Sequence, residues 1–541
     1  MTASTIRDPI RIAREDPARN WKVLDGSQAG KDLRIDCDVA IIGSGAGGGI
    51  SAEILVRAGL RVVMIEEGPF KSSSDFRMRE REAYPQLYQE SAGRQTLDKG
   101  ITILQGRSVG GSTTVNWTSS FRTPEATLAY WVRQFGLDEY ATDRLAPWFE
   151  HVEARLGIER WPQPPNANND VLRRGCEKLG IASNAMRRNV RGCWNLGYCG
   201  MGCPTNAKQS MLVTTIPAAL DGGMTLIHST RVERIVHRFD RAASLSARGM
   251  VGVAAEGRRF TVRARHFVLA GGAINNPGLM LRSQFPDPYD RLGKRTFLHP
   301  STVSAALFAE KVEGYSGAPQ TVYSDHFLQA AAIDGPVGFK LEAPPIHPVL
   351  AGITLQGFGH DHAAWMKRLP NLQVLIALLR DGFHAESQGG QVAVRNDGSP
   401  VLDYPVSDFL WEGARRSLLA MAEIQFAAGA RQVMPLHEDA APCRSWAEAK
   451  KLIEGLPMAI LRTRLASAHV MGGCGMGADP RHAVVAGDGR HHQFDNVWVF
   501  DGSAFPTSIG ANPQVSIYAM AARNATQLAD FLTGKPRQAA A

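Results

Sequence analysis

The chain has 541 residues, of which 44% are hydrophobic and 21% charged, with a formal net charge of +8 at pH 7. This composition is ordinary for a globular protein of two or three domains. Lys and Arg are scattered rather than gathered in blocks, which argues against nucleic acid as a partner. No apolar run reaches the roughly 18 residues of a membrane-spanning helix, so we expect no transmembrane segment.

Residues 1–34 are polar and rich in Arg and Asp, and they predict an arm that lies over the surface. The first twenty residues have no apolar core, so we expect no signal peptide and a cytoplasmic location.

A dinucleotide-binding unit is predicted between Cys37 and Pro69. An apolar strand at 39–42 leads into a glycine turn, a helix from about 48 to 58, and a second strand at 61–65. The three glycines suit a tight turn, a close backbone approach and close helix–strand packing: Gly43, Gly45 and Gly48. The helix would point its N-terminal amides at a pyrophosphate, and Glu66 would accept hydrogen bonds from a ribose.

Two further glycine-rich segments follow. In GRSVGGSTTVNW, residues 106–117, the glycine pair and the hydroxyl run suit a loop that packs against a flat cofactor. In AGGAINNPGLMLRS, residues 270–283, a strand again passes through glycines into a helix. Residues 306–464 have no glycine fingerprint and mix β-rich pieces with amphipathic helices, which predicts a separate substrate domain.

Three cysteines lie within eleven residues: Cys193, Cys199 and Cys203. Thiolate ligands suit iron–sulfur clusters or zinc. The spacing is not the CxxC pairing of a zinc ribbon, and no histidine lies near enough in sequence to complete a tetrahedral site. Three ligands suit a three-iron cluster. The alternatives are a disulfide with one free thiol, or three reduced cysteines in a tight loop.

Four separated motifs together resemble the glucose–methanol–choline (GMC) flavoprotein oxidoreductases. They are GSGAGGG with Glu66, GRSVGGSTTVNW, AGGAINNPGLML, and the C-terminal region with His469 and Asn512. The resemblance implies an α/β fold class (α+β overall), with a Rossmann-like FAD-binding domain and a discontinuous substrate domain built on an antiparallel sheet with helices. The FAD-binding domain would comprise residues 35–125, 225–305 and 465–541. Residues 126–224 would form an excursion that carries the cysteine loop, and residues 306–464 the substrate domain.

The same resemblance implies a set of FAD contacts. Gly43, Gly45 and Gly48 would lie at the diphosphate and Glu66 at the adenosine ribose. Further contacts are implied for Gly110, Gly111 and Asn116 near the diphosphate and flavin, for Val232 at the adenine, and for Asp501 near the ribityl chain. No histidine lies within 102–116, where some relatives tether the flavin, so we expect noncovalent FAD.

Different regions resemble different members of the family. The tail is similar to cholesterol oxidase, and residues 337–394 are similar to long-chain fatty alcohol oxidases, which implies an apolar alcohol as substrate. The cysteine loop resembles that of the catalytic subunit of bacterial FAD-dependent glucose dehydrogenases, where it holds a [3Fe–4S] cluster. That resemblance implies electron transfer through a cluster to a cytochrome c-type acceptor or a quinone. It also implies a small export-chaperone subunit, which would carry the folded chain to the periplasm or the membrane.

Oxidation of an alcohol by a flavin removes a hydroxyl proton and a hydride. His469 stands where the family keeps its catalytic histidine, and its titration near neutrality suits a proton acceptor. Asn512 precedes Pro513, and its amide would donate to the substrate oxygen as negative charge develops. Without the motif, a core histidine and an Asn-Pro turn would be the simpler interpretations. Two other functions stay open: an oxygen-dependent alcohol oxidase with structural cysteines, and a flavin electron-transfer or sensor subunit without its own substrate.

Overall fold

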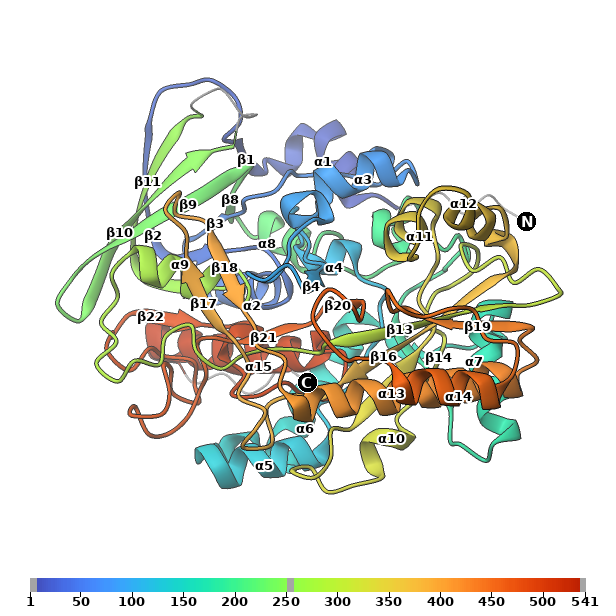
Figure 1. The fold of residues 1–541 in the computed structure, drawn as a ribbon. Coiled ribbons are helices and arrows are strands. Elements are labelled where there is room, and N and C mark those ends of the chain that lie inside the picture. The colour runs from blue at the N-terminus through green and yellow to red at the C-terminus, as the bar shows by residue number, and fades with distance from the viewer. Residues whose placement is uncertain (1–6, 251–256, 536–541) are drawn as a thin grey trace.

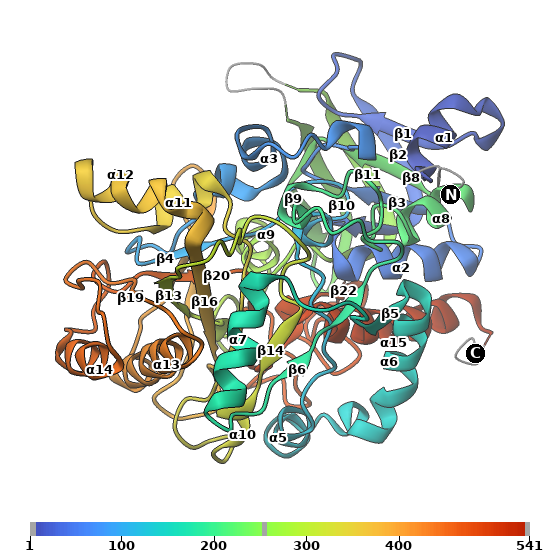
Figure 2. The ribbon, with the colours of Figure 1, turned by 90° about the vertical axis from the view of Figure 1, so that its right-hand side faces the viewer.

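The computed structural model describes residues 7–250 and 257–535 of the chain. Two large sheets organise these residues, and helices cover their outer faces (Figures 1 and 2). The first sheet runs in the order β1-β8-β3-β2-β11-β10-β9, with β22 paired to β11 beside this path. Its strands are β1 (Lys22–Asp25), β2 (Leu33–Ile42), β3 (Val62–Ile65), β8 (Thr225–His228), β9 (Thr230–Arg238), β10 (Arg241–Gly249), β11 (Arg259–Leu269) and β22 (Val497–Val499).

The centre of this sheet is parallel, because β1, β8, β3, β2, β11 and β22 all pair in the same direction. The strands β9, β10 and β11 form an antiparallel meander at one edge. Helix α2 (Ala46–Arg57) follows β2 directly, and the C-terminal helix α15 (Gln514–Thr533) packs against it (Figure 1). Helices α6 (Thr142–Leu156) and α8 (Thr215–Asp221) extend this layer. The last part of the chain therefore completes the core that the first part begins.

The second sheet runs in the order β4-β20-β13-β16-β15-β14-β6, and β19 also pairs with β13. Most of its neighbours are antiparallel. Its strands are β4 (Ile101–Ile103), β6 (Asn184–Ala185), β13 (Ser301–Leu307), β14 (Val322–Ser324), β15 (Phe339–Glu342), β16 (Leu372–Leu379), β19 (Gln432–Pro435) and β20 (Leu465–Ser467). A two-stranded ladder of β12 (Thr296–Leu298) and β21 (Val470–Gly472) lies where the chain passes between the sheets.

Side chains alternate along β16 and so serve both faces of the second sheet. Leu375 and Ala377 pack against Leu418 and Met421 of α13 (Asp408–Ala427). The intervening positions turn to the other face, toward α11 (Pro348–Thr354) and α12 (Gly359–Lys367). The remaining α-helices are α1 (Pro9–Glu15), α3 (Glu80–Leu87), α4 (Ser112–Val115), α5 (Glu125–Phe135), α7 (Ala167–Lys178), α9 (Asn275–Arg282), α10 (His326–Gln329) and α14 (Trp446–Gly455).

The predicted α/β fold class is confirmed, but the structure differs from the sequence at two boundaries. The segment expected as a surface arm contributes β1, which pairs in parallel with β8 and extends the first sheet. A strand of four residues is too short to show a period of two, so the sequence carries no clear sign of it. The expected boundary at 305/306 falls inside β13, which belongs to the second sheet. In the described ranges, no helix is both long and apolar enough to cross a membrane.

Candidate active site

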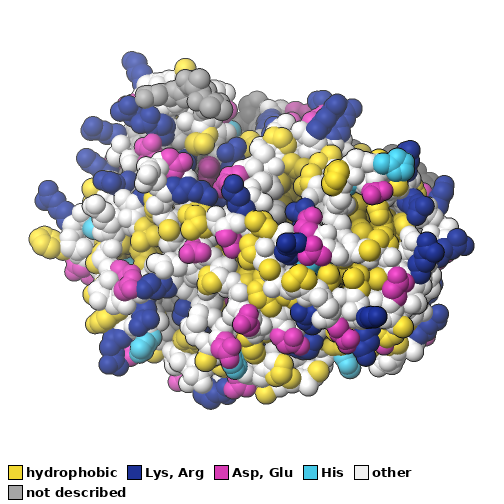
Figure 3. Space-filling model, viewed as in Figure 1, with side chains coloured by type: hydrophobic (Ala, Val, Ile, Leu, Met, Phe, Trp, Pro, Cys, Tyr) yellow, Lys and Arg dark blue, Asp and Glu magenta, His cyan; other side chains and the backbone are white. Residues whose placement is uncertain are grey.

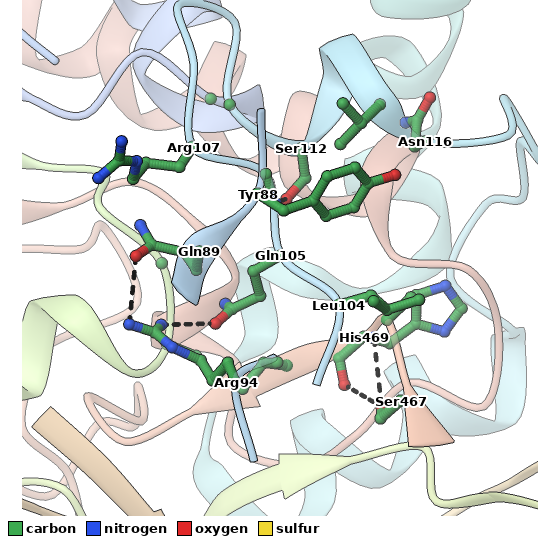
Figure 4. A pocket seen from close by; sticks show the side chains of 18 of the residues that line it. Tyr88, Gln89, Arg94, Leu104, Gln105, Arg107, Ser112, Asn116, Ser467 and His469 are labelled. Carbon is green, nitrogen blue, oxygen red and sulfur yellow. Dashed lines mark hydrogen bonds between the residues drawn. The ribbon is translucent and has the colours of Figure 1, made fainter. Parts of the chain in front are cut away.

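A cavity of about 770 Å³ lies between the two sheets. The glycine turns of the first sheet line one part of it, and β13, β16 and α11 line another. Figure 4 shows part of its wall, with Tyr88, Leu104 and His469 at one end and Arg94, held by Gln89 and Gln105, at the other. The cavity joins segments from most of the chain, including both ends of the proposed FAD-binding domain.

The first glycine turn shapes one wall of this cavity. Gly43 has φ +98°, and a Cβ there would lie 2.4 Å from the carbonyl oxygen of Ala270. A Cβ on Gly48 would lie 2.0 Å from the oxygen of Gly43, so Gly48 lets helix α2 pack directly on the turn. A Cβ on Gly45, in contrast, would meet only the Cα of Gly111, 3.9 Å away, and no side chain caps α2 there. The N-terminal amides of α2 are therefore free to bind an anion.

Glu66 lies at the end of β3 and lines the cavity. Its carboxylate accepts hydrogen bonds from the backbone and hydroxyl of Ser44, at 3.0 and 2.6 Å, and from the backbone of Gly68 at 2.8 Å. Burial raises the pKa of this carboxyl group, while these donors act in the opposite direction. Glu66 thus ties the glycine turn to the second strand as well as facing the cavity.

Most of the predicted cofactor residues line this one cavity. They are Gly43, Gly45, Glu66, Gly111, Asn116, Val232 and Asp501. Gly48 and Gly110 are not in its wall and have packing roles instead; Gly110 has φ +89°, and a Cβ there would lie 2.4 Å from Oγ1 of Thr114. Asp501 accepts hydrogen bonds from the backbone of Gly272 and the amide of Asn276, and so connects the glycine-rich segment 270–283 to the C-terminal part of the chain.

The two histidines His299 and His469 face each other at the cavity. The antiparallel pairing of β12 with β21 sets Leu298 opposite Val470, and the next pair in this register is His299 and His469. Their Nδ1 atoms lie 3.0 Å apart, and the backbone amide of Gly510 lies 3.1 Å from Nε2 of His299. Burial lowers the pKa of His469 to about 3, and the charge of Lys340 acts in the same direction. Because its pKa is this low, His469 is a neutral imidazole at neutral pH, and it lines the cavity.

Asn512 lies just before α15 and also lines the cavity. Its amide nitrogen donates to Oε2 of Glu342 at 3.3 Å. Its amide oxygen is buried and has no hydrogen-bond partner among the described residues. The sequence predicted a donor to the substrate oxygen. In the structure one N–H is used by Glu342, and the amide oxygen is buried rather than exposed to the cavity.

Behind Asn512 lies a buried ion pair on β15. Lys340 and Glu342 are two residues apart on this strand and share a face, with 3.8 Å between Nζ and Oε1. The ammonium group also lies 2.7 Å from the ring centroid of Phe121 and 4.6 Å from that of Tyr323. Burial lowers the pKa of Lys340 to about 7 and raises that of Glu342, whereas each partner opposes the other's shift.

The part of the cavity around His469 and Asn512 is aliphatic. Leu372, Val374 and Ile376 project from β16, and Val303 projects from β13. Helix α11 closes this part with Leu350, Ala351 and Leu355. Its outer side is apolar too, since Ile353 is 62% exposed and Phe358, just beyond the helix, is 90% exposed. Hydrophobic side chains accordingly gather on the surface over α11 (Figure 3).

Family models for GMC oxidoreductase match residues 84–301 and 385–521, and so cover most of the chain. A GMC-type oxidoreductase of Mycobacterium tuberculosis is 32% identical over 500 residues, which are 92% of this chain and 76% of that protein. The chain is a GMC oxidoreductase. Long-chain-alcohol oxidase FAO4B of Arabidopsis thaliana is 29% identical over 99% of this chain and 71% of its own.

Solved structures show the same fold at lower identity. Pyridoxine 4-oxidase from Mesorbium loti superposes with a TM-score of 0.66 at 18% identity, over 91% of this chain and 99% of that chain. A variant of formate oxidase from Aspergillus oryzae superposes with a TM-score of 0.69 at 13% identity, over 93% and 99%. The protein is thus an FAD-binding flavoprotein of the GMC family, an oxidoreductase that acts on CH–OH groups.

The residues present fit FAD. The N-terminus of α2 has no side-chain cap and so suits the diphosphate. Arg107 adds a positive charge to the cavity wall, and its buried Nε has no hydrogen-bond partner in the described part of the chain. Glu66 and Val232, which the sequence predicts to contact the ribose and the adenine of FAD, both line this cavity. Bound FAD would supply the hydride acceptor.

The cysteine loop of this GMC oxidoreductase lies directly against the cavity wall. Buried Lys208 donates to the carbonyl oxygens of Thr114, Asn116 and Cys199, and so ties the loop to the segment that lines the cavity. Cys193, Cys199 and Cys203 are free, partly exposed thiols. Within residues 7–250 and 257–535, no three His, Cys, Asp or Glu side chains form a group that could hold a metal ion. The side-chain arrangement in the described residues therefore does not fit the predicted cluster.

Sequence analysis missed His299, Lys340 and Glu342 as parts of the site. From the sequence alone Glu342 could be an acid near the site or a surface carboxylate, because an acidic residue in a strand is usually exposed. The sequence does hold one sign of the ion pair. Lys340 and Glu342 are two residues apart in FKLE, and side chains two residues apart in a strand lie on the same face. The contact of His299 with His469 follows from the register of β12 and β21, which could not be predicted from the sequence.

Proposed function

We propose that this GMC oxidoreductase oxidises the hydroxyl group of an apolar alcohol by hydride transfer to FAD, with oxygen as the final electron acceptor. The observation that carries the substrate class is the aliphatic wall that β13, β16 and α11 form beside the predicted catalytic pair, His469 and Asn512. A sugar would need many more hydrogen-bonding partners there, because unpaired buried polar groups are costly.

Within this cavity, His469 and Asn512 are the groups that would hold the hydroxyl. The aliphatic wall would hold the rest of the alcohol and exclude water from the reacting carbon. The ion pair of Lys340 and Glu342 would support Asn512 from behind, since Glu342 accepts from its amide.

The names of the relatives support oxygen as the acceptor. Four long-chain-alcohol oxidases of Arabidopsis thaliana are 26–29% identical to this chain, and the structural neighbours include pyridoxine 4-oxidase and formate oxidase. The competing predictions are a cluster in the cysteine loop with a cytochrome partner, and a flavin sensor subunit without a substrate.

Anaerobic stopped-flow measurement of flavin absorbance, with decanol, a sterol and glucose, tests the substrate class. We expect faster flavin reduction with decanol or the sterol than with glucose; faster reduction by glucose would overturn the proposal. Hydrogen peroxide release in air, with iron and acid-labile sulfide analysis of anaerobically purified protein, tests the acceptor. Stoichiometric peroxide without iron supports oxygen, whereas three irons per chain with slow peroxide release would support the cluster. No flavin reduction by any alcohol would favour the sensor.

The cavity wall predicts a limit on substrate length. Ala351 lies on the inner side of α11, so Ala351→Phe should fill part of the aliphatic space. We expect kcat/KM for a long-chain alcohol to fall by about tenfold or more relative to kcat/KM for a short-chain alcohol. Enzymes discriminate by a similar factor between substrates that differ by one methylene group in an apolar pocket. Ile353→Phe on the exposed side of the same helix is the control. Equal losses for both alcohols would place the chain-binding site elsewhere.

Asn512→Ala should slow flavin reduction by roughly 10²- to 10³-fold if its amide binds the substrate oxygen or hydroxyl. The flavin spectrum should remain, because Asn512 holds no part of the glycine turns. Flavin reduction at the wild-type rate in this variant would remove Asn512 from the hydroxyl site.

A further inference from the structure

The structure determines which of the two rings, His299 or His469, donates the hydrogen bond between them. His299 is 1% exposed and follows β12, while His469 lies at the cavity wall before β21. A backbone N–H can only donate, so the amide of Gly510 requires an unprotonated Nε2 on His299. A neutral His299 then carries its proton on Nδ1 and donates it to Nδ1 of His469, 3.0 Å away.

The tautomer of His469 follows from this direction. Nδ1 of His469 accepts the hydrogen bond from His299, so a neutral His469 carries its proton on Nε2. No described residue provides a hydrogen-bond partner for Nε2, and the side chain lines the cavity. Burial keeps both rings neutral, since it lowers the pKa of His299 well below its ordinary value and that of His469 to about 3.

We propose that His299 is a positioning residue that makes His469 a hydrogen-bond donor, through Nε2–H, to the oxygen of the substrate alcohol and of the carbonyl product. This role differs from the proton acceptor predicted from the sequence, which would need a lone pair on the cavity-facing nitrogen. The hydride would pass to FAD and the hydroxyl proton to water, and both end on hydrogen peroxide when oxygen reoxidises the flavin. The inference rests on the proposed alcohol oxidation for the identity of the bound oxygen, but not for the tautomer.

The assignment gives the cavity one hydrogen-bond donor for the oxygen of a hydroxyl group. Nε2–H of His469 would donate to the hydroxyl oxygen of the bound alcohol. An amine, which is protonated at neutral pH and offers no lone pair, would leave Nε2–H unpaired and should bind less well.

The first test reads the tautomer directly. Long-range ¹H–¹⁵N correlation spectra of the FAD-loaded protein with ¹⁵N-labelled histidine distinguish protonated from unprotonated ring nitrogens. Spectra of His469→Ala and His299→Asn assign the signals among the 15 histidines. We expect a protonated Nε2 and an unprotonated Nδ1 on His469. The reverse tautomer would overturn the proposal, whether or not the protein oxidises any alcohol.

The second test uses two substitutions of nearly equal shape. His299→Asn retains an N–H that can donate to His469, whereas His299→Asp can only accept from it and so reverses the hydrogen bond. At alkaline pH, where the His469 of the Asp variant is neutral, we expect flavin reduction in His299→Asp to be about 10²- to 10³-fold slower than in His299→Asn, the effect of losing one oxygen-binding donor. The flavin spectrum reports that both variants hold FAD.

A His299→Asp variant that reduces its flavin as fast as His299→Asn, or faster, would show that His469 works through a lone pair and would overturn the proposal. If neither variant retains FAD, the tautomer spectrum of the wild-type protein decides alone. A correct tautomer with no flavin reduction by any alcohol would uphold the role of His299 and reject the proposed function instead.

Discussion

Replacing His469 with alanine should slow flavin reduction by about 10²- to 10⁴-fold while FAD remains bound. His469 lines the aliphatic part of the cavity together with Asn512, whereas the glycine turns and Glu66 form the wall predicted for the nucleotide. The substitution removes a group that would contact the reacting oxygen, either as a hydrogen-bond donor or as a proton acceptor. The rate is measured by anaerobic stopped flow, and the FAD content by flavin absorbance after denaturation.

His360→Ala is the matched control for this substitution, because the side chain of His360 is 94% exposed on α12, away from the cavity wall. It should leave the rate unchanged. A His469→Ala protein that is reduced at the wild-type rate would remove His469 from the chemistry. Loss of FAD in that variant would instead show a role in cofactor binding.

The second large effect concerns the buried ion pair behind Asn512. Glu342→Ala should lower the free energy of unfolding by about 3–5 kcal/mol, because it leaves the Lys340 ammonium buried without its carboxylate. The aromatic faces of Phe121 and Tyr323 remain beside the ammonium but do not replace a full negative charge. The thermal unfolding midpoint of the FAD-loaded protein, followed by circular dichroism, measures the loss.

The double variant Lys340→Met/Glu342→Leu provides the comparison. Two apolar residues of similar volume should restore most of the lost stability, as replacement of a buried pair often does. Flavin reduction should stay slow in the double variant, because Asn512 has still lost the acceptor that fixes its amide. A double variant as unstable as Glu342→Ala would mean that the pair itself is not the cause. A double variant with full activity would mean that Glu342 does not position Asn512.

The cysteine loop shows where spacing alone is a poor guide. Cys193, Cys199 and Cys203 are close in sequence, but the direction of each thiol depends on the turns between them. Three glycines with positive φ, Gly192, Gly197 and Gly202, set these turns. The loop is fixed to the cavity wall through Lys208, yet its thiols do not form a metal-binding group among the described residues.

The sequence alone determined the nucleotide-binding unit, because every interaction that defines it is local. The strand, the glycine turn, the helix and the acidic residue at the end of β3 all lie within about thirty residues. The close approach that Gly43 and Gly48 permit involves backbone atoms whose position the turn itself sets. Four such ordered motifs were enough to indicate the family.

The tertiary structure decided the chemistry of the proposed alcohol site. His299 and His469 are 170 residues apart, and Asn512 and Glu342 are also 170 apart. These contacts depend on strand register and on how the second sheet packs against the first, and a single sequence states neither. The same packing places Lys340 and Glu342 in the interior, although charged residues that alternate with apolar ones in a strand usually face solvent. The sequence could therefore name His469 as the candidate catalytic histidine, but in our proposal the nitrogen that carries its proton depends on a backbone amide, that of Gly510, which only the folded chain brings to His299.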